Sequence, residues 1–331
     1  MSDRANLIAA FLRSVGWGEA RHRPLAGDAS MRRYVRLFRG SDTAILMDAD
    51  PAHGEDVRPF LQIARHLRAC GLAAPEIMAE DAETGLLLLE DFGDGVFARI
   101  ATLQPERETS LYLAATEVLL TLHRQPPPKD LEAATPRRLA GMIAPAFEWY
   151  AGQDAVEAET IAAFETALTD HAAETDVLIL RDYHAENLVW REAGAGIGRV
   201  GLLDFQDAMQ GHPAYDLVSL LQDARRDVGT KAAEAALTFY LRESGRNRDE
   251  FGSAIAILGA QRNTRILGIF ARLAALRGKP HYIDLIPRVW RHLQKDLAHP
   301  ALAGIARLMQ DALPPPDHCH LKGLKARCRM P

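Results

Sequence analysis

The chain has few cysteines and no long apolar run. Its 331 residues include three cysteines, Cys70, Cys319 and Cys328, and an odd, scattered set does not describe a disulfide framework. No stretch of about 18 apolar residues occurs, which is the length that a membrane-spanning helix needs. Residues 1–4 also lack a basic region followed by an apolar stretch, as a secretory signal would have. We therefore expect a soluble, cytoplasmic protein without a membrane partner.

The sequence also lacks a strong charge of either sign. Its net charge is −5, with 48% apolar and 25% charged residues, which is ordinary for a globular protein. A general nucleic-acid binder would need basic residues to neutralise phosphates, so we expect no nucleic-acid partner. The length allows one large domain or two lobes.

A group of polar residues around position 182 stands out. Asp182 is followed five positions later by Asn187, and Asp204 comes at the end of a short apolar run. A carboxylate can accept the proton of an attacking hydroxyl, while an amide oxygen and a second carboxylate can hold Mg²⁺ for phosphoryl transfer from ATP. Asp182 would then be the base, and Asn187 and Asp204 the metal ligands.

The flanking sequence supports this interpretation. Three short apolar stretches are predicted to be strands, at residues 177–180, 188–190 and 199–203. Strand ends of this kind would hold the three polar side chains rigidly enough for a metal site. Taken singly, each of these residues could instead be a turn residue or a helix cap.

The same region resembles a known superfamily. Asp182-x4-Asn187 with His184, then Leu-Asp-Phe at 203–205 and Gly-His-Pro-Ala-Tyr-Asp-Leu at 211–217, are similar to the aminoglycoside phosphotransferase and choline kinase superfamily. Within it, the chain most resembles the bacterial kinases that phosphorylate N-acetylmuramate and N-acetylglucosamine on the anomeric hydroxyl. The segments that suggest this likeness are residues 27–34, 47–51, 204–208, 261–263 and 267–272.

The resemblance implies an α+β, bilobal, protein-kinase-like fold. The small β-rich N-lobe would span residues 1–92 and the large, mainly helical C-lobe residues 93–331. Helices and strands predicted from periodicity and turn residues fit these lobes, with strands at 21–25, 31–38, 43–48, 75–79 and 86–90 and helices at 5–15, 57–69, 105–124, 137–152, 155–173, 213–226, 232–244, 249–277, 282–298 and 301–313. The basic tail, about 314–331, is predicted to be disordered.

The residues that could bind the nucleotide are less clearly marked in the sequence than those of the catalytic segment. The turn before residue 31 has a single glycine, and Ser30, Arg32 and Arg33 follow it, so these three could bind the triphosphate or form an ordinary hairpin turn. By the resemblance, the Glu90 carbonyl and the Phe92 amide would receive adenine. A plain acidic loop is the alternative for that segment.

The chain departs from the kinase pattern at one place. The phosphate-binding lysine should stand near Met47, and its glutamate partner in the helix at 57–69, where the interior has only Gln62. The loss of one half of a buried ion pair costs roughly 3–5 kcal/mol, whereas the loss of both is tolerable. Arg32 or Arg33 could supply the missing charge. The anomeric sugar kinases have a similar Met-Asp here, which favours them.

Further residues are candidates for the acceptor and for support of the loop. Gln206 and Asp207 adjoin the predicted metal ligand and could contact the acceptor. Arg262 and Arg265 share one helix face and could bind the carboxylate of a lactyl sugar, or pair with nearby acids.

The resemblance also implies supporting roles for His184 and for Asp216, which would accept backbone amides of the catalytic loop. Arg181 stands where the family usually has glycine, and Leu180 stands where it has histidine.

These observations lead to one functional hypothesis and two alternatives. The hypothesis is an ATP- and Mg²⁺-dependent kinase that phosphorylates N-acetylmuramate or N-acetylglucosamine at C1, in cell-wall sugar recycling upstream of a nucleotidyltransferase. An aminoglycoside or other small-alcohol phosphotransferase is the first alternative. A nucleotide-binding pseudokinase is the second, supported only by the missing lysine.

Overall fold

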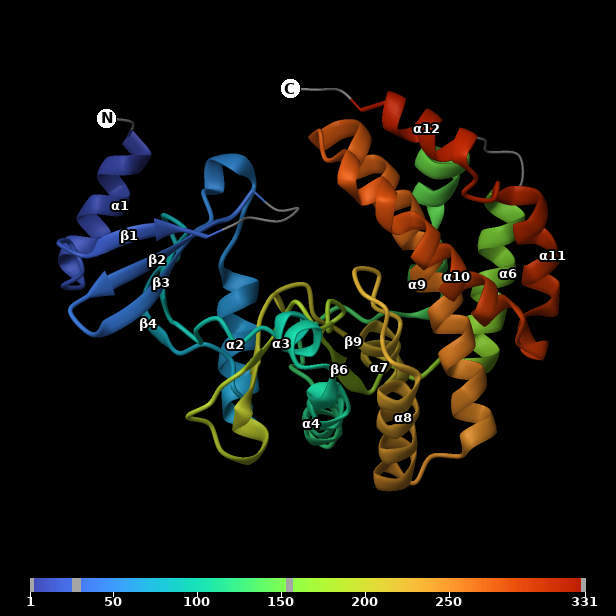
Figure 1. Ribbon diagram of the computed structural model, residues 1–331, viewed down its shortest axis with the longest axis horizontal. Helices are drawn as coiled ribbons and strands as arrows, with labels where there is room; N and C mark the ends of the chain where they lie inside the picture. Colours follow the sequence, from blue (N-terminus) through green and yellow to red (C-terminus); the bar gives the residue numbers. More distant parts are fainter. Residues whose placement is uncertain (1–2, 26–30, 153–156, 329–331) are drawn as a thin grey trace. The chain divides into compact units, whose positions relative to one another are not determined.

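The computed structural model describes residues 3–25, 31–152 and 157–328 (Figure 1). The chain forms two compact units: the described residues of Met1–Arg99 and Glu186–Asp207, and those of Ile100–Ala185 and Ala208–Pro331. It passes from the second unit into the first between Ala185 and Glu186, within the segment that carries Asp182 and Asn187. The predicted lobe boundary between residues 92 and 93 stays a prediction.

The first unit is built on an antiparallel sheet of five strands in the order β1-β2-β3-β5-β4. The strands are β1 (Arg21–Pro24), β2 (Arg33–Arg39), β3 (Asp42–Asp48), β4 (Ile77–Asp81) and β5 (Leu86–Glu90). On one face, alternate residues of β3 pack with Phe11 and Leu12 of α1 (Asp3–Ser14) and with Trp17 just beyond it. This alternation is the period-2 pattern of a half-buried strand, and it explains why the strands could be predicted from sequence.

A small hairpin completes this unit. β7 (Leu188–Trp190) pairs with β8 (Val200–Leu202), and Leu202 donates a hydrogen bond of 2.8 Å from its N–H to the Ala73 carbonyl, just beyond α2 (Arg58–Ala69). The Trp190 N–H donates to the Gly95 carbonyl at 2.6 Å. These backbone contacts fix the hairpin that carries Asn187 and Asp204 at its open end.

The second unit is mainly helical. Its centre is α9 (Arg248–Arg277), whose middle third is almost wholly buried and which lies beside α10 (Ile286–Leu297) (Figure 1). A Cβ on Gly268 would overlap the Pro145 backbone, so only glycine permits this close approach.

The other α-helices of the described residues are α3 (Phe97–Leu103), which runs from one unit into the other, α4 (Glu108–His123), α5 (Pro136–Gly141), α6 (Glu157–His171), α7 (Ala214–Leu221), α8 (Thr230–Ser244), α11 (Ala303–Ala312) and α12 (His318–Ala326). The second unit also contains the π-helix η3 (Ala146–Ala151) and a strand pair, β6 (Val177–Ile179) with β9 (Met209–Gly211). No helix in the described part of the chain is long and apolar enough to cross a membrane.

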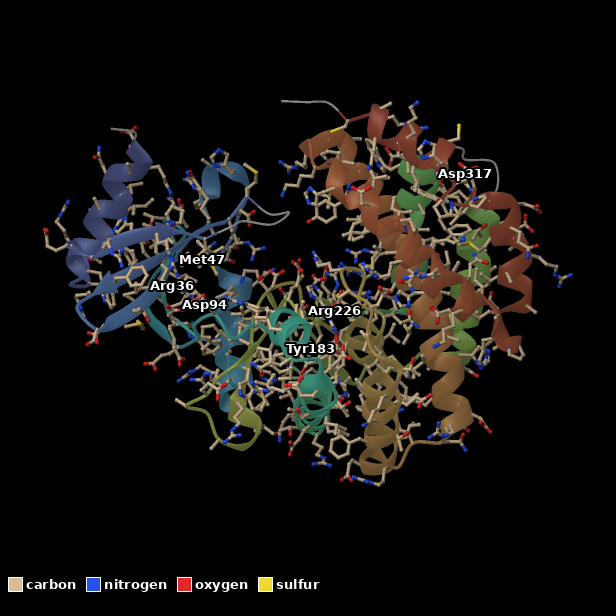
Figure 2. All side chains as sticks on the ribbon, viewed as in Figure 1. Arg36, Met47, Asp94, Tyr183, Arg226 and Asp317 are labelled. Carbon is tan, nitrogen blue, oxygen red and sulfur yellow. The ribbon has the colours of Figure 1, made fainter. Side chains whose placement is uncertain are left out.

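The prediction of a disordered tail is wrong. Residues 318–326 form α12, which begins at Asp317 (labelled in Figure 2), whose carboxylate accepts a hydrogen bond from the His320 N–H at 2.7 Å. Leu324 is buried, and Lys325 pairs with Asp284 at 2.5 Å. An N-cap aspartate followed by apolar residues three apart is the signal that predicts this helix. The basic composition of the tail favoured a prediction of disorder instead, because the contacts that hold this segment against the rest of the unit cannot be recognised in the local sequence.

A buried acid lies between α9 and α10. The Asp296 carboxylate accepts hydrogen bonds from the Gln222 and Asn263 side-chain amides, at 2.7 and 3.1 Å. Burial raises the pKa of Asp296 to about 7, although both hydrogen bonds lower it. In the unfolded chain the same group has a pKa of 3.8. The folded state therefore holds a proton at mildly acidic pH that the unfolded state releases, and Asp296 makes the free energy of unfolding fall as pH rises from about 4 to about 7.

We expect Asp296→Asn to remove this dependence. The amide keeps the side chain's size and carries no charge. The free energy of unfolding of the variant, relative to that of the wild type, should therefore rise by on the order of 2–4 kcal/mol as the pH goes from 5 to 8. Thermal unfolding of both proteins across this range measures the difference, with Asp311→Asn at an exposed position as the matched control. An equal difference at every pH would show that Asp296 does not titrate there.

Candidate active site

The two predicted metal ligands meet within the first unit. Asn187 directly precedes β7, and Asp204 follows β8 by two residues, so the hairpin brings them together. The Asn187 Nδ2 lies 3.5 Å from the Asp204 Oδ2, and the Leu203 N–H donates to the Asn187 carbonyl at 3.0 Å. Asp204 has a left-handed backbone (φ 57°), a conformation that aspartate tolerates better than most residues.

This pair fits a magnesium ion. Mg²⁺ prefers carboxylate and amide oxygens and commonly takes one or two protein ligands, with water and substrate phosphates as the others. Asp204 is exposed, and the Gln206 side-chain amide donates to its Oδ1 at 2.9 Å, which orients the carboxylate. In the described ranges, no group of three histidines, cysteines or acids could hold a metal. Asp207 is also exposed. The metal and acceptor roles stay predictions.

The structure separates the two arginines proposed to replace the missing lysine. Met47 (Figure 2) is buried at the expected lysine position. Arg33 pairs at 2.8 Å with the buried Asp48, which also binds Arg4. Arg32 pairs with Glu55 at 3.0 Å.

The charge of Asp204 distinguishes Arg32 further. Burial lowers the pKa of Arg32, but Tyr34, Glu55 and Asp204 together raise it above its usual value. The charge of Asp204 is thus one of the causes of the raised pKa of Arg32, and a phosphate-binding role for Arg32 stays a prediction. Ser30 lies outside the described residues.

The segment predicted to receive adenine is held by ion pairs. Arg36 on β2 contacts both oxygens of the Asp91 carboxylate, at 2.8 and 2.9 Å, and Asp94 at 2.7 Å (Figure 2). The Glu90 carboxylate pairs with Arg191 at 2.6 Å, and the Arg191 guanidinium covers the Phe92 ring at 4.5 Å. These contacts hold the side chains of residues 90–94 against the sheet and the β7–β8 hairpin. Adenine binding by the backbone of Glu90 and Phe92 stays a prediction.

Sequence reasoning did not find Arg36 or Arg191. Arg36 stands between Val35 and Leu37 in a strand. Because side chains alternate between the two faces of a strand, Arg36 lies on the face opposite to these two neighbours, together with other half-buried residues. An arginine at such a position needs a buried acid, and the three acids at 90–94 were the available partners. That pairing joins residues more than fifty positions apart, so no local pattern reveals it.

In the second unit, Asp182 follows a loop that is tied to α7. The Leu180 and Arg181 N–H groups donate to the two carboxylate oxygens of Asp216, at 2.5 and 2.8 Å. Asp216 is fully buried, and burial raises its pKa to about 7. The two backbone hydrogen bonds lower that pKa, the charge of Asp182 raises it, and the charge of Arg262 lowers it. This geometry agrees with the supporting role expected for Asp216, which stays a prediction.

The neighbours of Asp182 are anchored in the core. The Tyr183 hydroxyl (Figure 2) donates to the Ala115 carbonyl at 2.8 Å. The His184 Nε2 lies 3.2 Å from the Arg225 Nη1. Burial, then the charges of Arg225 and Arg262, lower the pKa of His184 well below its usual value. His184 is therefore neutral at physiological pH, and its supporting role stays a prediction.

Two arginines of α9 differ in exposure. Arg262 has only 5% of its surface exposed, and its Nη2 donates to the Ser219 hydroxyl at 2.8 Å. Arg265, three residues on, is half-buried. Of the two, Arg265 is the more exposed, and the acceptor roles of both stay predictions.

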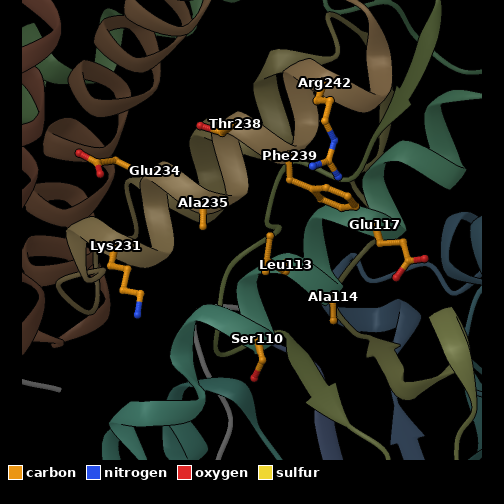
Figure 3. A pocket seen from close by; sticks show the side chains of 10 residues that line it. All are labelled: Ser110, Leu113, Ala114, Glu117, Lys231, Glu234, Ala235, Thr238, Phe239 and Arg242. Atoms are coloured by element: carbon orange, nitrogen blue, oxygen red, sulfur yellow. The ribbon is translucent and has the colours of Figure 1, made fainter.

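A groove elsewhere in the second unit contains none of these residues. It has a volume of about 730 Å³ and runs between α4 and α8 (Figure 3). Leu113, Ala235 and Phe239 form its apolar part, and Lys231 and Arg242 stand on its α8 side. It is therefore separate from the candidate active site.

The antiparallel sheet of the first unit, the helical second unit and the spacing of Asp182, Asn187 and Asp204 define the class of protein-kinase-like phosphotransferases. Residues 21–251 match the family model described as the phosphotransferase enzyme family, and this chain belongs to that family. The fold agrees. The choline kinase LicA from Streptococcus pneumoniae superposes with a TM-score of 0.65 at 15% identity, covering 89% of this chain and 100% of that one. The predicted α+β kinase-like fold is confirmed.

Two curated relatives are similar over most of their length. An N-acetylmuramate/N-acetylglucosamine kinase from Caulobacter vibrioides is 38% identical, covering 91% of this chain and 94% of the relative. A protein of the same name from Pseudomonas aeruginosa is 32% identical, covering 89% and 90%. The resemblance inferred from sequence motifs is thereby confirmed.

Proposed function

We propose that this protein is an ATP-dependent sugar kinase that phosphorylates the anomeric hydroxyl of N-acetylmuramate or N-acetylglucosamine. The observation that carries the kinase activity is the meeting of Asn187 and Asp204 on one hairpin, five and 22 positions after a loop that presents Asp182. The sugar class rests on the names of the full-length relatives. Membership in the phosphotransferase family supports ATP as the donor.

The proposed roles follow from the chemistry of each group. The Asp182 carboxylate accepts the proton of the C1 hydroxyl, whose oxygen bonds to the γ-phosphorus while the bond from that phosphorus to the bridging oxygen of ADP breaks. An anomeric hydroxyl is more acidic than an ordinary alcohol, so a carboxylate suffices as the base. Asn187 and Asp204 would hold Mg²⁺, which when bound supplies charge to screen the phosphates.

Other residues would position the two substrates. Arg32 would contribute a cation beside the phosphates, and the backbone of Glu90 and Phe92 would receive adenine. The side chains of Gln206 and Asp207 would contact the acceptor. The product would be a sugar 1-phosphate, formed in the cytoplasm and suited to a nucleotidyltransferase that activates such sugars in cell-wall recycling.

The direct test is ³¹P NMR of the purified protein with Mg²⁺, ATP and one acceptor at a time: N-acetylmuramate, N-acetylglucosamine, kanamycin or choline. A new phosphate signal coupled to the anomeric proton of either amino sugar is the expected result. Phosphorylation of kanamycin or choline alone would replace the sugar assignment by another alcohol acceptor. Nucleotide binding without transfer to any acceptor would favour a pseudokinase.

Arg265 is expected to distinguish the two sugars. N-acetylmuramate carries a lactyl carboxylate that N-acetylglucosamine lacks, and a half-buried arginine on α9 can pair with it. Arg265→Gln should lower kcat/KM for N-acetylmuramate by roughly 10–100-fold and change that for N-acetylglucosamine little. Arg248→Gln, at the exposed start of the same helix, is the control. Equal losses with both sugars would contradict a carboxylate contact.

A further inference from the structure

The residue before the proposed base has an unusual backbone. In the described part of the chain, the non-glycine residues with a left-handed φ are Arg181 (69°) and Asp204 (57°). For a long side chain such as that of arginine this conformation costs roughly 1–2 kcal/mol, and it persists only where the surroundings enforce it. The direction in which the Asp182 side chain leaves the loop depends on this residue, because the two are joined by one rigid peptide unit.

Three hydrogen bonds enforce the conformation of Arg181. Its N–H donates to Asp216, and its carbonyl accepts a hydrogen bond of 3.0 Å from the Ser219 hydroxyl. That hydroxyl oxygen in turn accepts a hydrogen bond from the Arg262 Nη2 at 2.8 Å. Asp216 and Ser219 are three residues apart on α7 and so share a face. One helix therefore contacts both backbone polar groups of Arg181.

Arg262 is an expensive residue to bury at this position. A buried charge needs compensation, and the Arg262 Nη2 donates to a neutral hydroxyl, that of Ser219. Burial lowers the pKa of Arg262, while Tyr215, Asp182 and Asp223 raise it. Its positive charge is thus balanced in part by the proposed base, and it is directed at the Ser219 hydroxyl that holds the loop.

We propose that Arg262, acting through Ser219, is a positioning residue that holds the Arg181 peptide and thereby aims the Asp182 carboxylate at the acceptor hydroxyl. This inference rests on the proposed kinase function but not on the identity of the acceptor. It gives Arg262 a different role from a direct contact with the sugar carboxylate.

A pH effect should accompany this role. Among the described residues, the charged or titratable groups coupled electrostatically to Asp216 include Asp182 and Tyr183 from the loop, Tyr240 from α8 and Arg262 from α9. Among them Arg262 is the cation, so its removal favours protonation of Asp216. A protonated carboxyl accepts the two loop N–H groups less well, and activity should then be lost at a higher pH than in the wild type.

The test compares Ser219→Ala, Arg262→Met and Arg262→Lys in the full-length protein. Ser219→Ala removes only the hydroxyl and should lower kcat by roughly 10–100-fold with little change in either KM. Arg262→Met should lower kcat similarly and move the acid limb of the kcat–pH profile up by about one unit. Arg262→Lys keeps the charge, so it should leave that limb in place and restore part of kcat.

Hydrogen exchange separates this inference from the proposed function. Without any substrate, amides of the peptide 178–184 should exchange faster in Ser219→Ala than in the wild type, because the loop loses one of its ties. The kinetic arm uses whichever acceptor the wild type phosphorylates, so a wrong sugar assignment leaves the test intact. Unchanged kcat in Ser219→Ala, a change confined to KM for the acceptor, or unchanged exchange in this peptide would each overturn the proposal.

Discussion

Replacement of Asp182 by asparagine is expected to lower kcat by about 10²–10⁴-fold and to leave ATP affinity nearly unchanged. The amide has almost the same shape as the carboxylate, so the loop tied to Asp216 should keep its conformation. It cannot accept the proton of the attacking hydroxyl, however, and that contribution exists only in the transition state. Initial rates with saturating ATP and sugar, together with calorimetric titration of ATP, measure the two quantities.

The control for this variant is Asp176→Asn, an exposed acid six residues earlier, which should retain wild-type turnover. Thermal unfolding of both variants tests that the fold is intact. Ordinary activity in Asp182→Asn would remove this residue from the mechanism. A large fall in ATP affinity would instead assign Asp182 to nucleotide or metal binding.

Arg36→Met should destabilise the protein by about 3–5 kcal/mol, because it leaves the Asp91 carboxylate buried without its cation. The Arg36 and Asp91 side chains are 7% and 5% exposed, so water cannot replace the lost contact. Burial lowers the pKa of Arg36, but hydrogen bonds and charges from Asp94 and Asp91 raise it above its usual value. The Arg36 guanidinium therefore stays charged beside Asp91. Urea unfolding of the variant and the wild type measures the loss.

Two further variants show whether the loss of stability comes from the buried ion pair. Asp94 is 63% exposed, so Asp94→Asn should cost no more than about 1 kcal/mol. The double variant Arg36→Met with Asp91→Leu removes both charges and should recover part of the stability lost in Arg36→Met. If Arg36→Met costs no more than Asp94→Asn, the ion pair does not anchor residues 90–94 to the sheet.

Local pattern alone was enough for most helices and strands, and it nominated the candidate site residues of the catalytic segment. The strand predicted at 188–190 coincides with β7, and that at 199–203 contains β8, because short apolar runs between turn residues have few other ways to be buried. The spacing of Asp182, Asn187 and Asp204 indicated a metal-assisted transfer for a different reason. Metal binding and proton transfer depend on the type of each residue and on how far its side chain reaches.

Elements that depend on distant partners were harder to predict. The three-residue strand β9 exists because it pairs with β6, some thirty positions earlier. The helix α12 is held by contacts such as the edge-on packing of the His320 ring on the Tyr150 ring, with 4.7 Å between the ring centroids. Short segments of this kind are marginal by themselves, so composition predicted disorder where packing supplies order.

Residue identity and spacing along the chain were enough to indicate the superfamily and to nominate a base and two metal ligands, and they showed that the usual lysine is missing. The folded chain was needed to show that Arg33 pairs with Asp48, that Arg32 pairs with Glu55 and that Arg262 donates to the Ser219 hydroxyl. An arginine side chain is long and can pair with any acid within its reach. Which acid it meets depends on the register of strands and the packing of helices far apart in sequence.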